Sequence, residues 1–313
     1  MKVKKWIFVT GAPRSATTFV GRILSAPLEV DYIHEPFNPE CGIPGIEQRY
    51  LYLRAKGNVD SDFDALFERI LRYDFSLRTG YYKNDTPFRR AIKRIIGSRG
   101  PFYLRLAKIN PFHTTALIKD PIGCLLTEYL ATRFGVRPLI LVRHPVTFVA
   151  STLRLGWSID ISAISDQPEL VEDYFESEED LLWAPGDDPL EAAARLWRAL
   201  NKVLLAQADQ HPEWPVLTHE EVSARPVEVF RDLYKHFDLK WSPRIEGLIR
   251  RRTGPKNKAE VAAGRVQDFR RDSAQLFAIR SRMLSSEQRR RVFELTSDVA
   301  KKLYSEESFG LEN

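Results

Sequence analysis

The stretch Thr10–Phe19, TGAPRSATTF, decides the fold, because it joins a buried strand to a helix through a turn that contains glycine and proline. Four apolar residues, Trp6–Val9, precede it and indicate a short buried strand. Helical spacing of apolar residues begins at Thr17 and stops before Pro27. At such a turn, free backbone N–H groups and the helix dipole point at a bound anion. The stretch therefore predicts a phosphate loop.

This loop lacks the lysine of the common nucleoside-triphosphate loops. The Walker pattern ends in Gly-Lys-Ser/Thr, whereas this chain has alanine at 16 and threonine at 17 and 18. The missing lysine is the group that reaches the β- and γ-phosphates, and the usual Mg²⁺ context goes with it. Arg14 supplies a fixed charge instead. We expect phosphate binding without metal, and no cluster of His, Asp or Glu in the sequence has metal-ligand spacing.

Further along the chain, short apolar runs alternate with segments of helical spacing, which predicts an α/β fold with a mostly parallel sheet. We expect a three-layer, P-loop-containing fold with about five strands flanked by helices, in a single domain over residues 1–313. Its scaffold comprises residues 1–37, 114–157 and 190–313, with a helical insertion at 38–113 and an acidic excursion at 158–189. Strands are expected at 6–9, 30–33, 116–119, 138–142 and 214–217, and an Arg/Lys-rich loop region between about 250 and 273.

Charge and composition narrow the class of protein. The 313 residues carry a formal net charge of +5, which suits an anionic ligand. Acidic stretches interrupt the basic ones, so a nucleic-acid partner is not expected. Cys41 and Cys124 have no metal-ligand neighbours and fit a reducing compartment. No apolar stretch approaches the roughly 20 residues of a membrane span, so a cytoplasmic location is expected, and contact with a membrane surface stays open.

The loop resembles the 5′-phosphosulfate loop of sulfotransferases that use 3′-phosphoadenosine 5′-phosphosulfate (PAPS), usually Pro-Lys/Arg-Ser-Gly-Thr-Thr. The glycine of that pattern is Ala16 here, so this residue needs either an ordinary backbone angle or a slightly different loop. The resemblance implies PAPS as donor, adenosine 3′,5′-bisphosphate (PAP) as product, and no metal. It implies that the donor is bound by Ala12, Pro13, Arg14, Ser15, Ala16, Thr17 and Thr18.

A second element supports the same resemblance. Arg143 ends the apolar run 138–142, and Ser151 follows eight residues later on the next helix. This pair is similar to the sulfotransferase element that binds the 3′-phosphate, for which a guanidinium and a hydroxyl are suitable donors. The alternatives are a surface ion pair for Arg143 and a hydroxyl bonded to its own helix for Ser151. His219 stands where the family places an aromatic residue near the nucleotide, although a surface histidine at a helix start fits as well.

The catalytic base must differ from that of many family members. Lys119 matches the family lysine, but Pro121 occupies the position of the histidine that often serves as base. Glu35, in His34-Glu35-Pro36, resembles the glutamate of carbohydrate sulfotransferases and ends a predicted strand. Because ligands of open α/β sheets bind at the carboxyl ends of the strands, we expect Glu35 as base, with Arg14 and Lys119 stabilising the developing charge. The alternative is a structural glutamate paired with an arginine.

The resemblance implies an enzyme that transfers a sulfuryl group to a hydroxyl of a carbohydrate, polysaccharide or glycolipid. Two alternatives stay open. One is a P-loop nucleotide kinase or NTPase, against which the missing lysine argues. The other is a nucleotide-binding protein without transfer activity, which Ala16 and Pro121 keep open.

Overall fold

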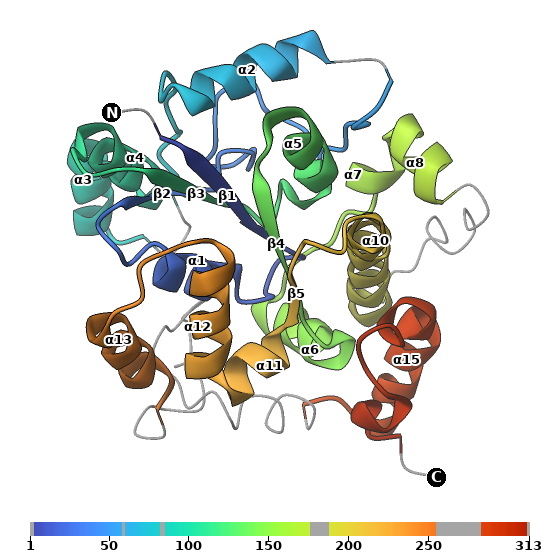
Figure 1. Cartoon of the computed structure of the whole chain (residues 1–313). Coiled ribbons are helices and arrows are strands. Elements are labelled where there is room, and N and C mark those ends of the chain that lie inside the picture. The colour runs from blue at the N-terminus through green and yellow to red at the C-terminus, as the bar shows by residue number, and fades with distance from the viewer. Residues whose placement is uncertain (1–2, 58–59, 82–84, 176–187, 255–282, 312–313) are drawn as a thin grey trace. The chain divides into compact units, whose positions relative to one another are not determined.

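The computed structural model describes residues 3–57, 60–81, 85–175, 188–254 and 283–311. Five strands form one sheet in the order β2-β3-β1-β4-β5. The pairs β1 with β3, β2 with β3 and β4 with β5 are all parallel. The strands are β1 (Lys5–Thr10), β2 (Val30–His34), β3 (Thr115–Lys119), β4 (Arg137–Val142) and β5 (Val216–Thr218) (Figure 1). The α/β prediction with about five parallel strands is confirmed.

Helices fill the connections between the strands, as alternation in the sequence predicts. The first part of the chain contains α1 (Thr17–Leu24), α2 (Ser61–Leu71), α3 (Pro87–Ile96), α4 (Arg99–Ile109), η1 (Cys124–Leu126) and α5 (Thr127–Phe134). The second part contains α6 (Pro145–Leu155), α7 (Ser162–Ser165), α8 (Pro168–Tyr174), α10 (Pro189–Gln210), α11 (His219–Ala224), α12 (Pro226–His236), α13 (Pro243–Thr253), α15 (Ser286–Ala300) and η3 (Glu306–Phe309). No helix among these described residues has the length and apolarity needed to cross a bilayer.

The chain divides into two compact units. The first unit comprises Met1–Thr10 and Val20–Leu139, and the second comprises Gly11–Phe19 and Ile140–Asn313. The predicted helical insertion at 38–113 belongs to the first unit and does contain helices, α2 to α4. The predicted excursion at 158–189 belongs to the second, and its residues 176–187 lie outside the described part. The single domain over residues 1–313 stays a prediction.

In the first unit, β3 lies between β1 and β2 with matched strand ends. Lys119 pairs with Val9 of β1 and with His34 of β2, so all three strands reach their carboxyl ends at one level. All five residues of β2 and of β3 are buried, as expected for strands covered on both faces. One hydrophobic core links these strands with α2 and α5, and it includes Phe8, Phe67 and Leu130.

Helix α4 is an element that sequence periodicity does not predict. It packs on β2 through its buried residues Gly100, Leu104 and Ala107. Apolar residues also occur on its other side, so the sequence lacks the single apolar stripe by which an amphipathic helix is recognised. The sequence pattern therefore predicts no helix at the end of the insertion, where α4 lies.

In the second unit, β4 pairs with β5, and the helices α6, α10 and α15 pack against one another. Helix α6 begins at Pro145, whose missing N–H is no loss in a first helical turn. The preceding residue, His144, caps this helix by accepting a bond from the Val146 N–H. The indole of Trp197 on α10 donates to the Arg143 carbonyl at 2.7 Å, which fixes the end of β4.

One prediction about the late basic region is wrong in part. Residues 250–253 belong to the last turn of α13 and are not a loop. Ser242 caps the start of this helix, and the three arginines 250–252 occupy its last turn, where cations are favourable next to the helix dipole. Residues 255–282, which include the rest of the predicted Arg/Lys-rich loop region with Arg270 and Arg271, lie outside the described residues.

Candidate active site

The predicted phosphate loop follows β1 directly and belongs to the second unit. Gly11 has a φ of +138°, and a Cβ there would lie 2.0 Å from the Leu141 carbonyl oxygen. Only glycine allows this approach of two backbones. The Ser15 N–H then donates to the Ala12 carbonyl at 3.2 Å, which closes the turn.

Two residues of this loop adopt the left-handed backbone region although they are not glycine. Arg14 has a φ of +73°, and Ala16 has a φ of +68°. Ala16 thus adopts a left-handed backbone angle that favours glycine, the residue that the resembling pattern has at this position. A left-handed angle costs a residue with a Cβ roughly 1–2 kcal/mol. Such strain is typical of segments whose conformation is set by a ligand-binding role.

The hydroxyl groups of the loop are buried at the start of α1. Ser15 is fully buried, and Thr17 and Thr18 are nearly so. The Ser15 Oγ has no hydrogen-bond partner among the residues that the structure describes. Because buried hydroxyl groups are nearly always satisfied, this atom is suited to bind a group that the described residues do not supply. A phosphate or sulfate oxygen bound in the loop would satisfy it.

The structure brings Arg14, Arg143 and Ser151 together within the second unit. Arg143 donates through Nη1 to the Arg14 carbonyl at 3.0 Å and through Nε to Thr147 Oγ1 at 2.9 Å. Arg14 in turn donates through Nε to Ser151 Oγ at 3.2 Å. Arg143 is almost fully buried, so it does not form the surface ion pair that the sequence left as an alternative. Ser151 is also buried and accepts from Arg14, whereas the alternative for it was a bond to its own helix. Two guanidinium groups and a hydroxyl thus converge as donors for an anion.

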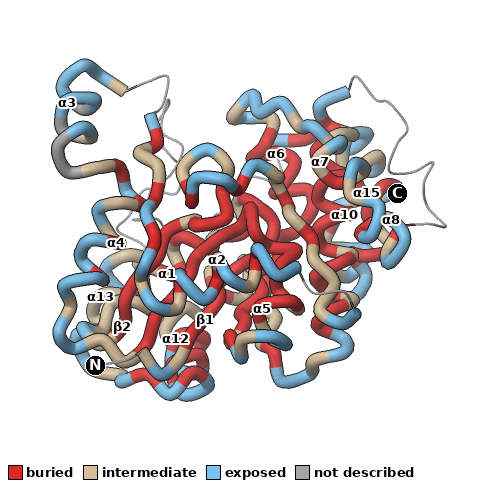
Figure 2. Tube along the Cα trace, turned by 90° about the horizontal axis from the view of Figure 1, so that it is seen from above, coloured by how far each residue is buried: buried red, intermediate tan, exposed pale blue. Residues whose placement is uncertain are grey.

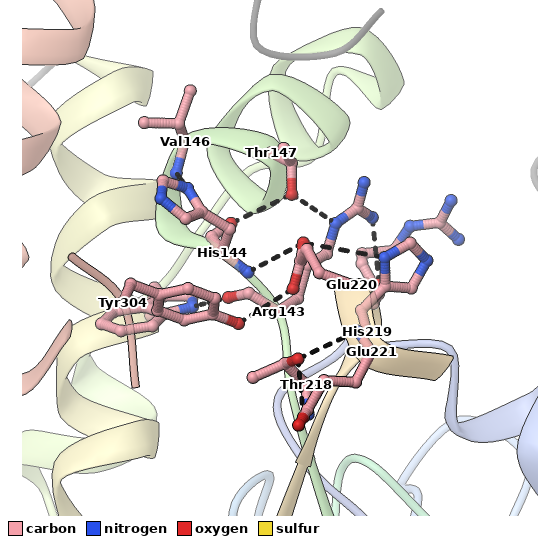
Figure 3. A network of polar contacts seen from close by, with 11 residues as sticks. Arg143, His144, Val146, Thr147, Thr218, His219, Glu220, Glu221 and Tyr304 are labelled. Carbon is pink, nitrogen blue, oxygen red and sulfur yellow. Dashed lines mark hydrogen bonds and ion pairs between the residues drawn. The ribbon is translucent and has the colours of Figure 1, made fainter. Parts of the chain in front are cut away.

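Arg143 belongs to a network of polar contacts, which Figure 3 shows in a close view. Glu220 accepts from the His144 N–H at 3.4 Å and from the Tyr304 hydroxyl at 3.0 Å. Burial alone would raise the pKa of Glu220, but His219, Arg143 and His144 lower it to about 2. Burial lowers the pKa of His144 to about 4. Glu220 opposes this shift, and Arg143 adds to it. The network therefore holds an ionised carboxylate beside Arg143 and a neutral imidazole at His144.

His219 is the first residue of α11, and its ring lies 3.7 Å from Glu220 Oε1. The helix start is fixed by a capping box, in which Thr218 and Glu221 bond reciprocally. His219 is thus beside the Arg143 network, although it also has the helix-start position that the sequence left as an alternative. Its predicted contact with a nucleotide stays a prediction.

Trp157 lies at the surface beside Arg14. Its side chain is 41% exposed, and the Arg14 guanidinium lies 5.7 Å from its ring centroid. The residue follows Gly156, which ends α6 in a left-handed conformation and turns the chain outward. An exposed indole beside a cation is typical of a surface that stacks with a planar ligand.

In the first unit, Glu35 and Lys119 form a buried ion pair at the strand ends. The Glu35 N–H donates to the Lys119 carbonyl at 2.8 Å, and the Lys119 ammonium donates to Glu35 Oε1. Lys119 is fully buried, and Glu35 has a φ of +50° that turns its side chain out of the strand direction. Glu35 thus pairs with the predicted lysine, and not with the arginine of the alternative interpretation.

Three further groups surround the Glu35 carboxylate. Asn38 Nδ2 donates to Glu35 Oε2 at 2.7 Å, and Cys41 Sγ lies 3.9 Å from the same oxygen. Burial alone would raise the pKa of Glu35, but Lys119, His34 and the Asn38 bond lower it to about 2. In this resting state the carboxylate is ionised and its oxygens are occupied.

Asp120 holds the turn that carries Glu35. Its carboxylate accepts from the Phe37 N–H at 2.7 Å and from the Ile122 and Gly123 N–H groups at 2.9 and 3.1 Å. Neither Asp120 nor Asn38 was identified from the sequence. Asn38 follows Glu35 by three residues, which is a common spacing in turns, and this spacing could have identified Asn38 as a partner of Glu35. Asp120 bonds a residue 83 positions away, which no local pattern indicates.

Within the described residues, no group of three or more His, Cys, Asp or Glu side chains could hold a metal ion.

Comparisons with known proteins give one coherent result. The chain matches the model of the sulfotransferase family over residues 7–243. No curated protein matches it. Among solved structures, it is similar to a sulfotransferase domain from the curacin biosynthetic pathway, with 14% identity, 94% of this chain and 98% of that chain covered, and a TM-score of 0.45. It is similar to a sulfotransferase domain from the olefin synthase of Synechococcus PCC 7002, with 12% identity, 97% and 96% coverage and a TM-score of 0.46. Sulfotransferase STF9 of Mycobacterium avium has 14% identity, 98% and 78% coverage and a TM-score of 0.45.

Proposed function

This chain belongs to the sulfotransferase family, and we propose that it transfers the sulfuryl group of PAPS to a hydroxyl of a carbohydrate, polysaccharide or glycolipid. Membership of this family decides against the kinase and NTPase alternative. The donor, the acceptor class and the roles of single residues are the parts of the proposal that experiment has to test.

The convergence of Arg14, Arg143 and Ser151 carries the proposal for the donor. PAPS has a phosphate on its 3′ position and a phosphosulfate on its 5′ position, so it needs two anion sites. The loop with its orphaned Ser15 hydroxyl suits the 5′ group. The buried donors Arg143 and Ser151 suit the 3′-phosphate, because a planar guanidinium binds two phosphate oxygens at once.

The catalytic roles follow from the ends of the strands. β1, β2 and β3 end level with one another, and the phosphate loop follows β1 in the chain. Glu35 and Lys119 stand at the ends of β2 and β3. In open parallel sheets this edge is where ligands bind. We assign Glu35 as the base that takes the proton of the acceptor hydroxyl.

The proposed reaction is an in-line displacement. The acceptor oxygen forms a bond to sulfur while the bond between sulfur and the oxygen of the 5′-phosphate breaks. The acceptor's proton goes to Glu35, and the electron pair of the broken bond stays on the phosphate oxygen. Arg14 and Lys119 stabilise this charge, in the manner of donors placed where charge develops.

The ion pair between Glu35 and Lys119 couples these two roles. A carboxylate whose pKa is about 2 is a weak base. When the Lys119 ammonium turns toward the leaving oxygen, Glu35 loses its strongest charge partner. Its pKa then rises, because burial is the largest of the effects that remain beside those of His34 and Asn38. The base becomes effective when the donor is in place.

Calorimetry tests the proposal for the donor. Titration with adenosine 3′,5′-bisphosphate should give binding, and titration with Mg²⁺-ATP should give binding that is far weaker. Absence of bisphosphate binding would overturn the proposed donor. Binding without transfer to any acceptor would support the alternative of a nucleotide-binding protein.

A transfer assay with labelled PAPS tests the acceptor. The panel consists of desulfated glycans, glycolipids and phenols. We expect label on the first two classes. Label on phenols alone would refute the acceptor class and leave the donor assignment intact.

A further inference from the structure

Helix α4 has two apolar sides, and only one of them is covered by the first unit. Gly100, Leu104 and Ala107 are buried on β2. Phe102, Leu106 and Ile109 are exposed by 39%, 46% and 75%. These three are spaced by four and three positions, so they form one stripe along the opposite side of the helix. A stripe of this kind is costly to leave in water.

Neighbouring segments extend the stripe at the carboxyl end of α4. Leu28 and Phe112 are exposed by 68% and 61%. The side chain of Asn110, which follows α4, ties both segments together. Its Nδ2 donates to the Leu28 carbonyl at 2.9 Å, and its Oδ1 accepts from the Phe112 N–H at 3.0 Å. Of the nine large hydrophobic side chains exposed in the described part of the chain, five therefore gather around this one helix. We call this set the α4 patch: Leu28, Phe102, Leu106, Ile109 and Phe112.

Cations border the α4 patch on both sides. At 100° per residue, Arg105 and Lys108 lie on one side of the stripe and Arg99 on the other, and all three are exposed. Helix α3, drawn mostly in the colour of exposed residues in Figure 2, adds the exposed Arg90 and Arg94. The sequence of residues 86–112 contains seven Lys and Arg and no Asp or Glu.

We propose that the α4 patch is a membrane-docking surface for bilayers that contain anionic lipids. Apolar side chains inside a border of cations match the two parts of such a bilayer, its acyl boundary and its negative headgroups. A helix that lies in the interface needs this combination, whereas a second copy of the chain would bring its own cations against these. The amino end of α4 also reaches the candidate site, since a Cβ at Gly100 would lie 3.5 Å from the His34 carbonyl oxygen.

Vesicle flotation tests the proposal with the full chain and without any donor or acceptor. The vesicles consist of phosphatidylcholine, either alone or mixed with phosphatidylglycerol. We expect binding to the mixed vesicles, weakened by added salt, and at least about 10-fold less binding to the neutral ones.

Two double variants separate the apolar and the cationic contributions. Phe102→Ser with Ile109→Ser should lower affinity at least about 10-fold. Arg94→Gln with Arg105→Gln should lower it about 30-fold. The matched control is Lys235→Gln with Lys240→Gln, which removes two exposed cations of the second unit and should leave vesicle binding unchanged. Thermal unfolding verifies that each variant is folded.

Three results would overturn the proposal. The first is a wild-type chain that does not float with mixed vesicles. The second is an affinity that the control variant lowers as much as Arg94→Gln with Arg105→Gln. The third is a wild-type dimer in sedimentation that Phe102→Ser with Ile109→Ser dissociates, without vesicle binding by either form. Because no step uses PAPS, these results are independent of the proposed donor and base.

Discussion

The phosphate loop and the Glu35 turn use the same backbone device for different ends. In the loop, Arg14 and Ala16 have positive φ angles, and in the turn Glu35 does. The loop contains a buried hydroxyl, Ser15 Oγ, that has no partner among the described residues. The turn instead satisfies its carboxylate through Lys119 and Asn38. Under the proposed function, the loop receives the donor with its hydroxyl available, whereas the contacts of the Glu35 turn have to change.

The strongest test of this difference is to remove the charge of the Glu35 turn. Glu35→Gln keeps the shape of the side chain and should lower kcat about 10²–10⁴-fold, because general-base catalysis is lost. Affinity for adenosine 3′,5′-bisphosphate should stay unchanged. Kinetics and calorimetry on the same preparation measure both quantities.

The matched control for that variant is Glu40→Gln. Glu40 is largely exposed and pairs with Arg49 at 2.5 Å, so its loss should change neither quantity. A Glu35→Gln variant with full activity would remove Glu35 as base, whereas a variant that no longer binds the bisphosphate would show that the two regions are not separable.

Acid should next distinguish the network around Arg143, which contains His144, from the Glu35 turn. The pKa of His144 is lowered to about 4, so the folded state resists its protonation. The unfolded chain takes up this proton near pH 6.5, and stability therefore falls as the pH is lowered from 6.5 to 4. The loss from this residue approaches about 3 kcal/mol at pH 4. The Glu35 ion pair, in contrast, persists until the pH approaches 2.

Urea unfolding at several pH values measures this effect. His144→Asn keeps a capping side chain for α6 and should flatten the pH dependence between 6.5 and 4. An unaltered slope in this variant would assign acid sensitivity to other groups, such as the buried His34, whose pKa is also lowered.

A smaller effect is expected for the hydroxyl of Ser151, which lies on α6 and accepts from Arg14 of the loop. Ser151→Ala removes one donor to the 3′-phosphate and should weaken bisphosphate binding about 10-fold. Thr152→Val is the control, because the Thr152 hydroxyl bonds the Phe148 carbonyl on its own helix at 3.0 Å. Calorimetry should show normal affinity for this control. Equal losses in both variants would indicate a general disturbance of α6.

The smallest effect concerns backbone strain in the loop. Ala16→Gly relieves the left-handed angle and should raise the free energy of unfolding by a few tenths to roughly 1 kcal/mol, after the entropy of glycine is subtracted. Ala192→Gly, in the helical geometry of α10, should lower it by roughly 0.5–1 kcal/mol. Urea unfolding of both variants gives the comparison. A destabilised Ala16→Gly variant would show that the loop is not strained at this position.

Local signals allowed the sequence to predict the strands and the loop region of the site. A strand, a turn and a helix start are encoded within a few residues, and so are Arg14, Ser15 and Thr17. Arg143 and Ser151 are encoded in the same way, at one strand end and on the helix that follows. That these residues meet at hydrogen-bond distance could be expected from the order of elements.

Long-range contacts and two-sided elements could not be predicted. Asp120 clamps the turn of Glu35 through a contact between distant positions, and its role depends on strand register. Helix α4 was missed because apolar residues on both sides hide its period. The run of charge at arginines 250–252 indicated a loop. These residues instead form the last turn of α13, where the helix dipole favours cations.

The Glu35–Lys119 pair also has a consequence for the hydrolysis of the donor by water. An activated sulfate is vulnerable to hydrolysis whenever a competent base meets a stray water molecule. A carboxylate with a pKa of about 2 accepts a proton from water poorly, and its partner ammonium is fully buried. Under the proposed mechanism, the Glu35–Lys119 pair would therefore suppress hydrolysis of the donor by water until the acceptor is bound.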